Sequence, residues 1–115
     1  MHEMSLAQGI LDMVEQAAVR ERFSRVKQLR LELGALSGVE RHALQFALDS
    51  MSHEGVLRDT EFVIETPQAT AWCMHCALNV AISERGDPCP QCGGHQLQPT
   101  SGTELRVVDM IVLDE

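Results

Sequence analysis

Four cysteines are the most chemically specific feature of this chain, and they form two Cys-x-x-Cys pairs, Cys73 with Cys76 and Cys89 with Cys92. Two residues between the cysteines of a pair allow a tight turn to direct both sulfurs at one ion. Two such turns complete a tetrahedron of thiolates, which suits Zn²⁺. Because a closed four-thiolate site has no open position, we expect a structural zinc ion that adds folding energy and performs no catalysis.

Two other interpretations of the cysteines stay open at this point. Four thiolates also bind iron in sites of the rubredoxin kind, and the thiols could be reduced and unliganded. His75 and His95 lie close to the cysteines in the sequence and could compete as ligands or orient them. Histidines in such positions are more often solvated turn residues, so we assign them no role.

The N-terminus offers a second metal site of different chemistry. The α-amine of Met1, the amide nitrogen of His2 and its imidazole can bind one ion in adjoining chelate rings, and Glu3 adds an oxygen. A nitrogen-rich set of this kind suits Ni²⁺ or Cu²⁺ better than Zn²⁺. On these residues alone, a solvated terminus is the alternative, because short motifs also occur by chance.

Charge and hydropathy narrow the possible environments and partners. The formal net charge is −8, from 17 acidic residues against nine Lys and Arg, which disfavours nucleic acid as a partner. No apolar run approaches the ~18 residues of a membrane span, and the first residues lack the order of a signal peptide. We therefore expect a cytosolic protein, in which reduced cysteines bind metal instead of forming disulfides.

Hydrophobic periodicity predicts the elements that position these groups. We expect a helix over 5–22, a strand over 26–33, a helix over about 40–53, and strands over about 60–66 and 104–113. The second helix begins after a capping-box pattern in which Glu40 is the acidic residue.

Residues 68–100 contain all four cysteines and few residues that could build a core. A strand at the end of the chain must pair with an earlier one, so this segment is predicted to be an insertion. The fold class is α+β, a small three-stranded sheet with two helices and an inserted four-cysteine zinc-ribbon module. The domains are 1–67 plus 101–115, which would bind nickel, and 68–100, which would bind zinc.

The start Met-His-Glu-Met-Ser-Leu, combined with both cysteine pairs, resembles the HypA/HybF family of nickel metallochaperones. The likeness covers the whole chain, including residues 31–38 (LELGALSG) and 102–107 (GTELRV). It implies that His2 is a nickel ligand, helped by the Met1 amine and Glu3, and that the four cysteines hold structural zinc.

The resemblance also implies partners. The family delivers Ni(II) for [NiFe]-hydrogenase maturation with a HypB-type GTPase, and its client is the hydrogenase large subunit; some relatives also serve urease. Glu40 is a possible additional oxygen donor, although a helix-capping role suits it better. We expect a monomer or a weak homodimer, without nucleic-acid or membrane partners.

Two other classes of function fit the sequence less well. A zinc-ribbon module that binds protein or nucleic acid would need a basic surface, but residues 70–100 contain only Arg85 as a Lys or Arg. An enzyme would need a nucleophile with its base or an open metal site, and the sequence shows neither. His42 and His53 are expected to be surface or packing residues.

Overall fold

The computed structural model describes residues 3–114, which divide into two compact units. The first unit comprises the residues up to Leu31, Val39–Glu65, and those from Val107 on. The second comprises Glu32–Gly38 and Thr66–Arg106, so it includes all four cysteines. The domain boundaries expected from the sequence remain a prediction. No helix in the described part of the chain is long and apolar enough to cross a membrane.

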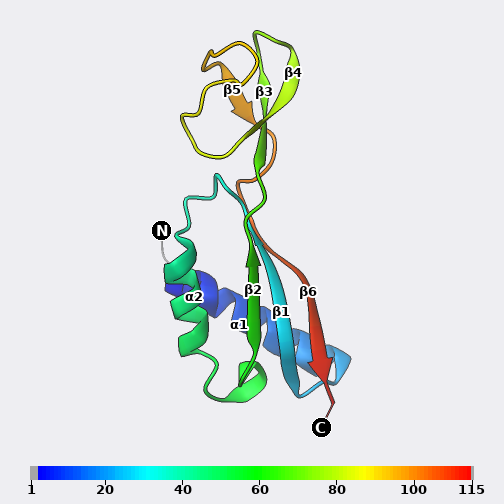
Figure 1. Ribbon diagram of the computed structural model, residues 1–115. Helices are drawn as coiled ribbons and strands as arrows, with labels where there is room; N and C mark the ends of the chain where they lie inside the picture. Colours follow the sequence, from blue (N-terminus) through cyan, green and yellow to red (C-terminus); the bar gives the residue numbers. More distant parts are fainter. Residues whose placement is uncertain (1–2, 115) are drawn as a thin grey trace. The chain divides into compact units, whose positions relative to one another are not determined.

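The first unit is built on a three-stranded sheet in the order β2-β1-β6 (Figure 1). Its strands are β1 (Arg25–Leu33), β2 (Glu61–Glu65) and β6 (Leu105–Leu113). The hydroxyl of Thr60 donates to the carbonyl of Val26, and the side-chain amide of Gln28 donates to the carboxylate of Glu61. Because both contacts advance in the same direction along the two segments, β1 and β2 run parallel. The amide of Ser24, just before β1, donates to the carbonyl of Leu113 at the end of β6, so these two strands are antiparallel.

Two helices and a short 3₁₀ turn complete the first unit: α1 (Glu3–Glu21), α2 (Arg41–Ser50) and η1 (Gly55–Leu57). The buried residues of α1 recur at helical spacing and are Ala7, Ile10, Val14 and Ala17. Those of α2 are Leu44, Ala47 and Leu48. On β1 the buried leucines alternate with polar residues, as expected for a strand that packs helices on one face.

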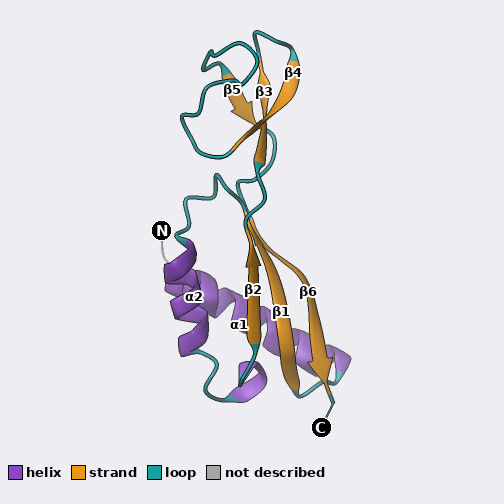
Figure 2. Cartoon of the chain, in the orientation of Figure 1, coloured by secondary structure: helices purple, strands orange, loops and turns teal. Residues whose placement is uncertain are grey.

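The second unit contains another three-stranded sheet, in the order β4-β3-β5, in which both strand pairs are antiparallel. Its strands are β3 (Ala69–Cys73), β4 (Leu78–Ile82) and β5 (Leu97–Pro99). Figure 2 shows that much of this unit, including the stretch between β4 and β5, is loop. The sequence did not predict this second sheet.

The predicted α+β fold is confirmed, with differences at the ends of elements. The second helix is shorter than predicted, because it ends at Ser50 and the chain then forms η1. Glu40 is the N-cap of α2 itself and not the third helical residue of a capping box. Its Oε2 accepts a hydrogen bond from the amide of His42 at 2.6 Å. Glu40 therefore does mark the beginning of the helix, but as the capping residue itself.

Candidate metal centre

The first cysteine turn follows directly from β3, whose last residue is Cys73. The carbonyl of Cys73 accepts a hydrogen bond from the amide of Ala77 at 2.8 Å, which closes the turn. The amide of Cys76 points at the sulfur of Cys73, with a distance of 3.4 Å. Closing the turn requires a positive φ of 55° at Ala77, an unfavourable conformation for a residue with a Cβ.

The second cysteine turn repeats this geometry in a loop. The carbonyl of Cys89 accepts from the amide of Gly93 at 2.8 Å, and Gly93 has a φ of 74°. The amide of Gln91 points at the Cys89 sulfur, and that of Gly94 at the Cys92 sulfur, both at 3.4 Å. Glycine tolerates this backbone where Ala77 is strained, so the second turn is the better adapted of the two.

The four sulfurs lie at the spacing that a tetrahedral zinc ion requires. The sulfurs of Cys73 and Cys92 are 3.8 Å apart and those of Cys76 and Cys89 are 4.0 Å apart, and all four lie within 4.8 Å of one another. With Zn–S bonds of ~2.3 Å, an ideal tetrahedron places its sulfurs about 3.8 Å apart. The set therefore fits Zn²⁺, and none of the four cysteines is in a disulfide.

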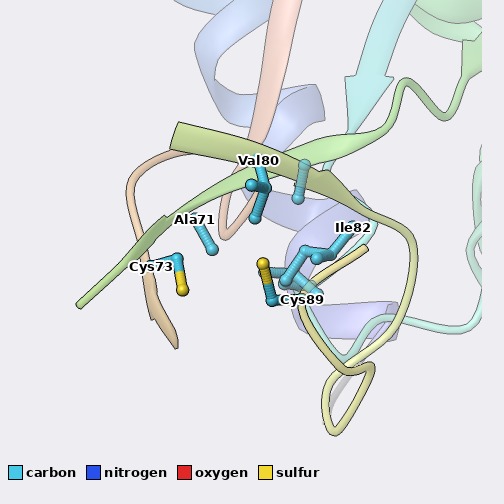
Figure 3. Packing of buried hydrophobic residues seen from close by; sticks show 7 residues of the cluster. Ala71, Cys73, Val80, Ile82 and Cys89 are labelled. Carbon is cyan, nitrogen blue, oxygen red and sulfur yellow. The ribbon is translucent and has the colours of Figure 1, made fainter. Parts of the chain in front are cut away.

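The four cysteines differ in how far they are buried. Cys73 and Cys89 are buried, Cys76 is half-buried and Cys92 is exposed. Figure 3 shows the first two inside the packed core of the unit, beside Ala71, Val80 and Ile82. Two of the four proposed metal ligands, Cys73 and Cys89, therefore belong to the hydrophobic core, whereas Cys92 lies at the surface.

The pKa values of two of the thiols are shifted in opposite directions. Burial acts to raise the pKa of the Cys89 thiol, but hydrogen bonds from the amides of Cys92 and Gln91 outweigh it and lower the pKa to about 7. Burial also raises the pKa of the Cys76 thiol, to about 12, and hydrogen bonds with Cys92 and Cys73 add to this. Four thiolates this close repel one another, so a divalent cation is the group that stabilises them together.

The neighbouring histidines are outside the cluster. Among the described residues, the four cysteines form the one group of His, Cys, Asp and Glu side chains close enough to hold an ion. His75 is exposed and lines a hollow of about 270 Å³ together with Cys73 and Cys92. His95 is also exposed and lines a separate hollow of about 180 Å³.

The predicted nickel ligands are only partly within the described residues. Met1 and His2 lie outside them, whereas Glu3 is the first residue of α1. The Oε2 atom of Glu3 accepts a hydrogen bond from the amide of Glu40 at 3.1 Å, which joins the beginning of α1 to the beginning of α2. His42 and His53 are exposed.

Some contributors to the cysteine cluster were not found from the sequence. The backbone amides of Gln91 and Gly94 are invisible in residue types, although any Cys-x-x-Cys turn implies donors of this kind. Leu36 belongs to the core around Cys73 and Cys89, yet it comes from a segment far earlier in the chain. No local signal reports such a contact, because it depends on how distant segments pack.

Comparison with known proteins supplies independent information on the whole chain. Residues 1–112 match a family described as HypA, hydrogenase/urease nickel incorporation, metallochaperone. The chain is 56% identical over 114 residues to the hydrogenase maturation factor HypA of Cupriavidus necator, covering 99% of this chain and 96% of that protein. It is 54% identical to the protein of the same name from Polaromonas naphthalenivorans, over the full length of both.

Solved structures agree on the fold. The solution structure of the Ni metallochaperone HypA from Helicobacter pylori matches with a TM-score of 0.71, at 20% identity and over the full length of both chains. At this identity the match concerns the fold alone. The full-length match to the family and the identities above 50% carry the assignment: the chain belongs to the HypA family of metallochaperones, which incorporate nickel into hydrogenase or urease and are not enzymes.

Proposed function

We propose that this chain binds Ni(II) at its N-terminus, through the Met1 amine, His2 and Glu3, and delivers it for [NiFe]-hydrogenase maturation. The donor set is rich in nitrogen, as Ni²⁺ prefers. The observation that carries the proposal is the full-length match to the HypA family, whose description is nickel incorporation. Glu3, the one proposed nickel ligand within the described residues, accepts a hydrogen bond from the amide of Glu40 at 3.1 Å.

An open site at a chain end suits a carrier. A carrier must release its metal. An ion held by a few donors at a chain terminus dissociates more easily than one enclosed by four protein ligands. Protonation of His2, or a partner that competes for the donors, would drive release. We infer that the partners are a HypB-type GTPase and the hydrogenase large subunit in the cytoplasm.

We propose zinc as the ion of the cysteine cluster, with Cys73, Cys76, Cys89 and Cys92 as its ligands. The spacing of the sulfurs supports this, and so does the absence of any other His or carboxylate in the cluster among the described residues. The site is closed by four protein ligands, so its role is structural. The zinc would stay bound while nickel is exchanged.

A nucleic-acid-binding ribbon is the less favoured alternative. The basic residues of the second unit are already engaged, since Arg85 donates to the carbonyl of Leu36 and Arg106 pairs with Glu32. They leave little positive surface for phosphates.

Metal analysis of untagged protein before and after nickel addition tests the proposal. We expect one zinc throughout and one nickel per chain, with nickel lost in His2→Ala and retained in the matched control His53→Ala. A single residue added before Met1 should also weaken nickel binding, because it moves the amine away from the chelate. Unchanged nickel binding by the extended protein would rule out the amine as a ligand.

A further inference from the structure

Access from solvent divides the four cysteines of the second unit. Cys73 and Cys89 are buried, Cys76 is half-buried, and Cys92 is exposed. A hollow of about 270 Å³ opens beside Cys92, and Cys73 also lines it, whereas the other two cysteines do not. The hollow therefore lies to one side of the sulfur cluster. It is several times larger than the ~30 Å³ that a water molecule occupies in the liquid, so a small reagent can reach the Cys92 sulfur.

The sulfur of Cys92 is chemically suited to attack a small oxidant. A metal ion keeps a coordinating thiol in its thiolate form, and the thiolate is the form of cysteine that acts as a nucleophile. Oxidation of a thiolate gives first a sulfenic acid, and it selects thiolates that are accessible to solvent. Cys92 is the most exposed of the four cysteines, so it should react first.

A second sulfur is placed to capture the oxidised one. The sulfur of Cys73 is 3.8 Å from that of Cys92, and both residues line the same hollow. A disulfide bond is about 2.05 Å long, so the two sulfurs need to approach each other by only about 1.8 Å. Cys92 lies in the loop between β4 and β5, where a shift of this size breaks no strand pairing.

We propose that Cys92 is an oxidation site, at which hydrogen peroxide converts the sulfur cluster to a Cys73–Cys92 disulfide and thereby releases its zinc. In the first step the Cys92 thiolate attacks one peroxide oxygen and the O–O bond breaks, which gives a sulfenic acid and a hydroxide ion. In the second step the Cys73 thiolate attacks the Cys92 sulfur and expels a second hydroxide ion. The two thiolates lose two electrons in total, and the peroxide gains them and ends, after protonation, as two water molecules.

Release of the ion follows from the loss of two of its four ligands, because zinc binds the thiolate and not the disulfide. Cys73 and Cys89 are also two of the three large side chains that are fully buried in the described part of this unit. Without the ion, so small a core does not keep the second unit folded. The first unit contains no cysteine, so oxidation should leave it unchanged.

The consequence is a reversible switch that responds to oxidants. A thiol reductant converts a disulfide back to two thiolates, whereas oxidation of a single cysteine beyond the sulfenic acid is largely irreversible. Capture by Cys73 therefore protects Cys92 from permanent damage. The inference rests on the proposed zinc site and is independent of the proposed nickel ligands.

Limited oxidation of untagged, zinc-loaded protein tests the site. Reductant is removed, an equimolar amount of hydrogen peroxide is added, and a zinc-sensitive dye follows release of the ion. The remaining thiols are then blocked with N-ethylmaleimide, and the protein is digested with trypsin. Arg85 lies between the two cysteine pairs, so the pairs fall on separate tryptic peptides. We expect zinc release to accompany a link between these two peptides, with Cys73 joined to Cys92.

A single methyl group tests the route of access. A Cβ on Gly94 would lie 3.5 Å from the Cys92 sulfur, which is an ordinary contact distance, and Gly94 lines the same hollow. Gly94→Ala therefore covers the sulfur without replacing a ligand, and it should slow zinc release by peroxide about two- to five-fold. Gly9→Ala on α1 is the matched control, because no atom lies within 4 Å of its added methyl group, and it should react at the wild-type rate. Competition with a zinc chelator checks that both variants bind zinc as the wild type does.

Dithiothreitol with added zinc should restore one zinc per chain, and a loss of zinc that it does not reverse would contradict the disulfide. A disulfide within one cysteine pair, zinc that stays bound after oxidation, or release from Gly94→Ala at the wild-type rate would also overturn the proposal. Zinc content is measured before oxidation as well. A reduced chain without zinc would refute the proposed zinc site together with this inference, whereas a zinc-loaded chain that peroxide does not oxidise would refute this inference alone.

Discussion

The two units differ in the amount of hydrophobic core that stabilises them. Among its described residues, the first unit has seven large side chains that are fully buried: Val14, Val26, Leu29, Leu31, Leu44, Leu48 and Leu57. The second has three, namely Leu36, Cys73 and Cys89, and two of these are proposed metal ligands. A unit with so little apolar burial needs a metal or a disulfide to fold, whereas the first unit has the material for a conventional core.

Metal removal should produce the largest difference between the units. Structural zinc sites contribute roughly 10–16 kcal/mol of apparent binding energy, which is also folding energy. A strong chelator in reducing buffer, or the variant Cys73→Ser, should therefore unfold the second unit and leave the first folded. Hydrogen exchange measured residue by residue checks this. Persisting protection of the β3 and β4 amides without metal would show that the second unit folds on apolar packing alone.

A cavity in the first core should have the opposite selectivity. Leu44 is fully buried on α2, and Leu44→Ala should destabilise the first unit by about 2–5 kcal/mol. The second unit should keep its zinc, because its core includes no residue of α2. Phe46→Ala on the same helix is the matched control and should change stability by less than about 0.5 kcal/mol. Thermal unfolding with a zinc-release assay separates the two effects.

The two cysteine turns allow a finer comparison within the second unit. Ala77 and Gly93 occupy equivalent positions with positive φ, so Ala77→Gly should strengthen the cluster by about 1 kcal/mol, or roughly five-fold in zinc affinity. Gly93→Ala should weaken it by a similar amount, since no atom lies within 4 Å of the added methyl group and only the backbone is strained. Competition with a zinc chelator measures both. Equal affinities in all three proteins would mean that the turns carry no strain.

The smallest expected effect concerns a surface ion pair of the first unit. A hydrogen bond from Arg30 lowers the pKa of Asp109 from its usual value of 3.8. A carboxyl whose pKa is lowered by folding stabilises the protein above that usual value, and the contribution disappears as pH falls through the folded pKa. Asp109→Asn should therefore melt slightly below the wild type at pH 7 and equally with it in strong acid. Asp12→Asn, which removes an exposed carboxylate on α1, is the control for the change of net charge.

The elements of both units were predictable to different degrees. The strands and helices of the first unit follow from apolar residues at spacings of two and of three to four, which operate within one element. The second sheet was missed because its strands are short and their buried residues are few, mainly Ala69, Ala71, Val80 and Ile82. Such strands exist only because they pair with each other around the cysteines, and pairing is a long-range property.

Packing between distant segments decided further features. Gly34 and Gly102 read as ordinary loop residues, yet the chain passes so close to itself that a Cβ on Gly34 would collide with the carbonyl of Gly102. The amide of Leu36 bonds to that same carbonyl at 2.7 Å, which holds the 32–38 segment in the second unit. These contacts join residues almost seventy positions apart, so no local pattern could reveal them.

The sequence by itself determined the four-cysteine motif, the family and the helix and strand pattern of the first unit, because spacing along the chain encodes turns and amphipathic faces directly. The tertiary structure decided that the four sulfurs gather at tetrahedral spacing, that Cys73 and Cys89 belong to a core, and that Glu3 contacts the start of α2. It also decided that β6 is an open edge. The physical reason is the same in each case: donors, sulfurs and edges acquire their chemistry from neighbours that are distant in sequence.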